Sequence, residues 1–109
     1  MKAKLVVPSV LACRDVEDAL GYYLNESTAQ VASGFIGALD RAYAHISQHP
    51  GTGSPRYAHE LSLLDLRAWP LRGYPYLVFY VERLKQIDVW RVLHSQRDIP
   101  AWMQEPEVE

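Results

Sequence analysis

The segment WRVLHSQRDIPAWM, residues 90–103, brings three side chains with acid–base or charge chemistry within five positions. His94 can serve as a general acid or base near neutral pH, Arg97 can stabilise a developing anion, and Asp98 can orient either of them. The same spacing also fits a structural role, in which Asp98 caps a final turn and pairs with Arg97. The structural role is favoured, and spacing alone leaves catalysis open.

A second set of candidates consists of arginines on or beside the expected strands in the second half of the chain. Their side chains can converge on one side of a sheet and hold a phosphate backbone or an acidic peptide, although solvated strand arginines are equally expected. The formal net charge is −2, from 11 basic and 13 acidic residues, so direct binding of nucleic acid is not expected. The set comprises Arg67, Arg72, Arg91 and Arg97.

His45 and His49 lie four positions apart, which would place both imidazoles on one helix face, as a metal pair requires. No further Cys or His pair stands at ligand spacing in the sequence, so no metal site is predicted. His59 and Glu60 begin a zinc-protease motif that fails because position 63 is leucine. The sequence predicts no cofactor.

Cys13 is the single cysteine, which excludes an internal disulfide and fits a reducing compartment. Its neighbours on an amphipathic helix predict a small core residue rather than a nucleophile. No apolar run approaches the length needed to span a bilayer, and the apolar stretch at the start is too short for a secretory signal. A cytoplasmic protein without membrane contact is therefore predicted.

The elements that must position these side chains begin with a strand and two helices. KLVVP predicts a short strand ended by Pro8, and Ser9 then caps a helix over residues 10–24 whose apolar residues recur every three or four positions. Ser27 and Gln30 form a capping box that starts a second helix. This helix ends before Pro50, and the short connection between the two helices predicts an antiparallel hairpin.

Glycines at positions 34 and 37 weaken the second helix and are expected to let the two helices approach closely. HPGTGSPR then reads as a loop, and LSLLDLRAW, YPYLVFYVE and IDVWRVLH read as three strands of an antiparallel meander. In the second of these strands Tyr76 and Tyr80 share a face, which is expected to be partly exposed.

The order of elements predicts an α+β fold: an N-terminal strand, a two-helix antiparallel hairpin and a three-stranded antiparallel meander, with the hairpin on one face of the sheet. Residues 1–103 are expected to form a single domain, followed by an acidic tail over residues 104–109. The other face of so small a sheet requires a cover or a partner.

These segments together resemble the ParE branch of the RelE/ParE toxins of bacterial type II toxin–antitoxin systems, over roughly residues 5–101. VWRVLHSQRDIP is the most specific piece, and LRAWPLRGYPYLVFYV is similar to the family's central strands. The helical pieces of the resemblance are Ser9, Ala12, Asp15, Val16, Ala19 and Tyr22, followed by Phe35, Leu39, Ala42, Ile46, Pro50 and Gly53.

The resemblance implies a small cytoplasmic toxin that is no enzyme, inhibits DNA gyrase and blocks replication, and is neutralised by a ParD-like antitoxin with which it forms a hetero-oligomer. The alternative, from the RelE relatives, is a ribosome-dependent mRNA endonuclease, here using His94, Arg91 and Arg97. Against it, the lysine-rich strand of those relatives is absent from this sequence and no tyrosine follows Tyr80. A third reading is an inactive toxin-like binding partner.

An antitoxin of this kind folds on the toxin through a disordered tail, and the tyrosine and arginine face of the sheet and the grooves beside the helical hairpin are suitable receivers. The residues expected to contact a partner are Arg67, Arg72, Tyr76, Tyr80, Arg91, His94, Arg97 and Asp98.

Overall fold

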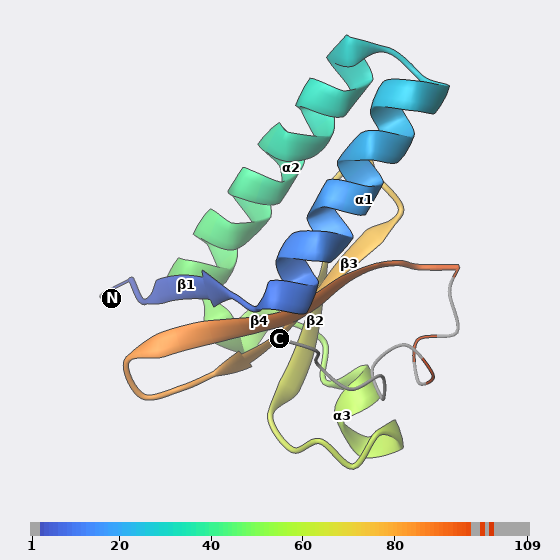
Figure 1. Ribbon diagram of the computed structural model, residues 1–109. Helices are drawn as coiled ribbons and strands as arrows, with labels where there is room; N and C mark the ends of the chain where they lie inside the picture. The colour runs from blue at the N-terminus through green and yellow to red at the C-terminus, as the bar shows by residue number, and fades with distance from the viewer. Residues whose placement is uncertain (1–2, 97–98, 100, 102–109) are drawn as a thin grey trace.

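The fold is a four-stranded sheet with a helical hairpin on one face and a short helix on the other (Figure 1). The computed structural model describes residues 3–96, 99 and 101. The expected α+β fold is confirmed. In chain order its elements are β1 (Leu5–Pro8), α1 (Val10–Glu26), α2 (Ala29–Gln48), a 3₁₀ turn (Pro50–Thr52), α3 (Arg56–Glu60), β2 (Leu66–Pro70), β3 (Tyr76–Glu82) and β4 (Gln86–His94).

The sheet has the order β1-β4-β3-β2, so β4, the last strand of the meander, lies between β1 and β3. β2, β3 and β4 are antiparallel neighbours, whereas β1 runs parallel to β4 and pairs with it only from Gln86 to Val89. The second half of β4, Trp90–His94, therefore has no neighbouring strand on the β1 side among the described residues. This half-open edge faces α1.

Ser9 caps α1 as the sequence predicts, and its hydroxyl also ties the helix to the sheet. The Ser9 Oγ accepts the backbone N–H of Ala12 at 3.0 Å and donates to the carbonyl of Trp90 at 2.8 Å. The N-terminus of α1 is thereby fixed at the point where β1 leaves the edge of β4.

The predicted capping box at Ser27 is wrong by one residue. Thr28 is the cap of α2, with its Oγ1 accepting the N–H of Val31 at 3.1 Å. The backbone N–H of Ser27 is already bonded to the carbonyl of Tyr23 at the end of α1, so the extended conformation that a cap requires falls on Thr28.

The face of the sheet that carries the tyrosines is the face that α1 and α2 cover, so the expected exposure of Tyr80 is wrong. Tyr80 is completely buried, and its Oη donates to the carbonyl of Pro50 at 2.7 Å and accepts the N–H of Gly53 at 3.1 Å. A phenol is amphipathic, and here the buried hydroxyl is satisfied by the loop after α2. The largest other side chains of this core that are fully buried are Phe35, Ile46, Val78, Ile87, Val89 and Val92.

The opposite face of the sheet is covered by α3 and the chain that follows it, a segment whose structure the sequence did not predict. The strand expected over residues 61–69 begins only at Leu66, because Ser62 and Asp65 take positive φ angles of 54° and 73° that an extended strand does not allow. Leu61 and Leu63 pack instead against a second core. Its buried members are Leu66, Ala68, Phe79, Val81, Leu93 and Ile99.

The glycines of α2 do not serve the contact between the two helices that was expected of them. A side chain at Gly34 would collide with the hydroxyl of Tyr74, which donates to the carbonyl of Val31 at 2.8 Å. A side chain at Gly37 would meet Arg41 of the same helix. Gly34 thus makes room for a tyrosine from the β2–β3 turn.

Candidate functional site

Arg91 is not part of an exposed basic surface, as had been expected, but half of a buried ion pair. Its Nε and Nη2 donate to the two carboxylate oxygens of Asp15, each at 2.8 Å, and the two side chains are 6% and 10% exposed. Asp15 also accepts the backbone N–H of Val92 at 2.9 Å, on the half-open edge of β4. A carboxylate from α1 therefore holds both a strand side chain and a strand backbone group.

The other predicted arginines do not converge. Arg67 on β2 is half-buried and donates from Nη1 to the carbonyl of Gly53 at 2.8 Å, whereas Arg72 is exposed in the turn that follows β2. Arg97 and Asp98 lie outside the described residues, as does the acidic tail over residues 104–109. Of the predicted contact residues, the structure brings together Tyr76 and His94.

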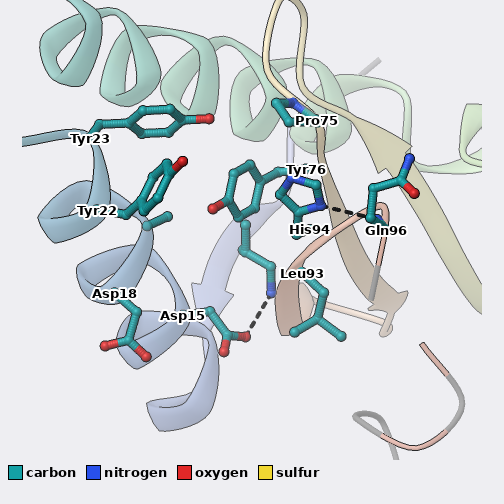
Figure 2. Close-up of a pocket in the computed structure, with 11 residues that line it drawn as sticks. Asp15, Asp18, Tyr22, Tyr23, Pro75, Tyr76, Leu93, His94 and Gln96 are labelled. Carbon is teal, nitrogen blue, oxygen red and sulfur yellow. Dashed lines mark hydrogen bonds between the residues drawn. The ribbon is translucent and has the colours of Figure 1, made fainter. Parts of the chain in front are cut away.

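Tyr76 and His94 form one wall of a pocket of about 660 Å³ between α1, the start of β3 and the end of β4 (Figure 2). The opposite wall is a stripe along α1, in which successive side chains three or four positions apart face the same way. The lining residues are Asp15, Asp18, Ala19, Tyr22, Tyr23, Pro75, Tyr76, Val92, Leu93, His94 and Gln96.

Aromatic rings in edge-to-face contact build the upper wall of this pocket. The ring centroid of Tyr23 lies 5.5 Å from the centroids of Tyr22 and Tyr74 and 6.3 Å from the centroid of Tyr76. Burial, and next the charges of the neighbouring tyrosines, raises the pKa of Tyr23 above its ordinary value. The Tyr23 hydroxyl therefore remains neutral at physiological pH and acts as a hydrogen-bonding group.

His94 closes the pocket at the end of β4. Its ring lies 5.2 Å from the Tyr76 ring at 73°, and its Nδ1 accepts the backbone N–H of Gln96 at 3.0 Å. Because Nδ1 is an acceptor, the neutral imidazole carries its proton on Nε2, which is then a hydrogen-bond donor. The carboxylates of the pocket belong to Asp15 and Asp18, and its described lining contains no lysine or arginine.

Asp15, Asp18, Tyr22 and Tyr23 were not among the residues expected from the sequence to contact a partner. Asp15, Asp18 and Tyr22 follow one another by three and four positions, which is the signature of one helix stripe, but this stripe borders the apolar face of α1. Only the position of β4 shows that the stripe faces a pocket instead of solvent.

The histidines considered as a metal pair pack beside Trp69 and Thr52. His45 stacks on Trp69 at 4.0 Å and its Nε2 is 2.8 Å from the hydroxyl of Thr52, with the His49 ring 5.3 Å away. Within the part of the chain that the structure describes, no three side chains are gathered to hold a metal.

Cys13 is exposed on α1, so its expected place in the core is wrong. None of the described helices is both long and apolar enough to cross a membrane.

The architecture is that of a small α+β protein in which a helical hairpin packs on a four-stranded sheet. A solved structure titled "Chromosomal ParDE TA system from P. aeruginosa" has a TM-score of 0.70 to this protein, with 15% sequence identity, and the match covers 84% of this chain and 96% of that chain. This likeness shows a shared fold. A search among curated proteins gives no match.

The sequence model of one family covers most of the described chain. This family, described as the ParE toxin of the type II toxin–antitoxin system parDE, matches over residues 6–99. The protein belongs to this ParE toxin family.

Proposed function

We propose that this protein is a cytoplasmic toxin that inhibits DNA gyrase without enzymatic activity of its own and is neutralised by a ParD-like antitoxin. The observation that carries the proposal is the family match over residues 6–99, which takes in all the helices and nearly all of the sheet. The solved relative from P. aeruginosa is itself a ParDE system, which supports an antitoxin as partner.

The arrangement around His94 supports gyrase over mRNA as the target. A ribonuclease must place cationic groups where the phosphate backbone lies. Arg91, a candidate for that task, is held by Asp15, and the described lining of the pocket beside His94 carries a further carboxylate, Asp18, and no lysine or arginine. An anionic substrate would be repelled from this pocket.

Purified protein tests the two targets side by side. We expect inhibition of gyrase supercoiling with accumulation of cleaved DNA, and no cleavage of mRNA in ribosomes programmed with a defined message. Unchanged supercoiling together with ribosome-dependent cuts would establish the RelE-like alternative, and inactivity in both assays would establish an inactive binding partner.

Arg72 is the exposed, described member of the predicted arginine set, and with Arg97 it is our candidate contact for the target. Arg72→Ala should weaken gyrase inhibition about fivefold, because a contact arginine contributes about 1 kcal/mol or more to an interface. Arg41→Ala, which removes an exposed arginine from α2, is the matched control. Equal inhibition by the two variants would remove Arg72 from the contact surface.

A further inference from the structure

The pocket between α1, β3 and β4 has one carboxylate with no partner in the described structure. Asp15 is engaged by Arg91 and by the N–H of Val92. Asp18, one turn further along α1, is exposed and forms no ion pair or hydrogen bond with any described residue. Arg14, four positions before Asp18, is exposed and does not line the pocket. Asp18 is thus available to a cation that enters.

Aromatic rings line the same pocket. Tyr22 is 59% exposed at the rim, and Tyr76 and His94 meet edge to face at the opposite wall (Figure 2). The face of a tyrosine ring attracts a cation through its quadrupole, more strongly as water is excluded. A carboxylate beside such rings favours a ligand that is both cationic and able to stack.

The inner surface of the pocket is apolar, which favours an amino-acid side chain over a simple cation as the ligand. Ala19, Val92 and Leu93 contribute to the lining, and all three are buried. The aliphatic stem of lysine or arginine packs against such a surface while its charged end reaches a polar group. Arginine fits better, because its planar fork binds a carboxylate with two hydrogen bonds and stacks on aromatic rings, whereas an ammonium is more strongly hydrated.

We propose that this pocket receives an arginine side chain of the antitoxin, with the guanidinium between Asp18 and the Tyr22 and Tyr76 rings. The antitoxin as partner rests on the proposed function, and the arginine rests on the pocket itself. A volume of about 660 Å³ exceeds one side chain, so the residues that flank the arginine enter with it. The arginine is then an anchor of the type that dominates protein interfaces.

The first experiment uses a small probe and does not depend on the antitoxin. Isotope-labelled protein is titrated with Nα-acetyl-argininamide and followed by amide chemical shifts. We expect saturable shifts at Asp18, Tyr22, Tyr76 and His94, and no saturation with the citrulline analogue, which has the same shape without the charge. Asp18→Asn should weaken the probe at least about fivefold. Asp40→Asn, an exposed carboxylate on α2, should leave binding unchanged.

The second experiment uses the antitoxin encoded beside this chain and measures its affinity by calorimetry. Asp18→Asn and Tyr22→Ala should each weaken binding at least about tenfold, whereas Tyr22→Phe should keep it within about twofold. Both positions changed here are exposed, and thermal unfolding checks that each of the three variants remains folded.

The two proposals fail in different ways. Wild-type affinity in Asp18→Asn and Tyr22→Ala, or equal binding of the citrulline probe, would overturn the arginine pocket and leave the antitoxin as partner. Absence of antitoxin binding to the wild-type protein would overturn the proposed partner, and with it the antitoxin arginine, even where the probe binds.

Discussion

The pair of Asp15 and Arg91 offers a sharp test of what holds α1 on the sheet. Asp15→Ala removes the acceptor of two guanidinium N–H groups and of the Val92 N–H, and leaves an arginine side chain that is 6% exposed without its carboxylate. Breaking a buried ion pair from one side costs about 3–5 kcal/mol, because the remaining buried charge loses the carboxylate that compensates it. A small domain is stable by only about 5–15 kcal/mol, so this substitution removes a large part of the total.

A double-mutant cycle separates the pair from its surroundings. Arg91→Met keeps much of the apolar stem and removes the charge, and in the double variant both charges of the pair are gone. We expect the double variant to be less destabilised than the sum of the single variants by about 2 kcal/mol or more, with the lost hydrogen bond of Val92 accounting for about 1–3 kcal/mol of what remains. The free energy of unfolding is measured by urea denaturation with circular dichroism.

The exposed pair between Arg83 and Asp88 is the matched control. Its N–O distance is 3.1 Å, but its side chains are 53% and 31% exposed, so Arg83→Ala should cost at most about 1 kcal/mol. A loss below about 1 kcal/mol for Asp15→Ala, or a coupling energy near zero in the cycle, would refute the view that Asp15 and Arg91 fasten the helix to the strand.

Three further outcomes are expected, each checked by the free energy of unfolding. Thr28→Ala should lower the free energy of unfolding by about 1 kcal/mol, because Thr28 is the helix cap, whereas Ser27→Ala should lower it by less than about 0.5 kcal/mol. A larger loss for Ser27→Ala than for Thr28→Ala would restore the predicted capping box. Gly34→Ala should destabilise the otherwise wild-type protein, although alanine has the better helix propensity, because its methyl group meets the Tyr74 hydroxyl. In a Tyr74→Phe background, where this hydroxyl is absent, the substitution should no longer be destabilising. Equal effects in both backgrounds would exclude the clash. Burial, and then the nearby charges, raises the pKa of Tyr43 from 10.0 to about 12, so its contribution to stability is complete below pH 10 and is lost as the pH rises through about 12. Tyr43→Phe should flatten this loss, and identical pH profiles would contradict the assignment.

The fold was predictable wherever one local pattern decided it. The three-and-four spacing of α1 and α2, the Ser9 cap and the strand-forming composition of β3 and β4 each depend on neighbours in sequence, and each was confirmed. α3 was missed because its five residues are too few to show a helical period. The strand run before Leu66 was overextended because apolar leucines in a turn and in a strand look alike until the backbone angles of Ser62 and Asp65 are known.

The candidate site was harder to predict because burial, not residue type, decides which side chains are available. Tyr76 and Tyr80 have the same parity along β3, yet the first lines the pocket and the second is sealed by Pro50 and Gly53. Arg91 looked like a surface cation because its carboxylate lies 76 positions earlier in the sequence. Pairing over such distances in the chain leaves no local signal.

The central place of β4 in the sheet also determines when, during synthesis of the chain, the sheet and the pocket can form. β1 has no strand to pair with until residues 86–89 exist, and Asp15 has no backbone partner until residue 92 exists. Contacts that close so long a loop form late, because the entropy of the intervening chain must first be overcome. A chain interrupted before residue 86 contains both helices of the hairpin and the first two strands of the meander, but neither the Asp15–Arg91 pair nor the pocket. Incomplete chains therefore lack the pocket that we propose for the antitoxin arginine.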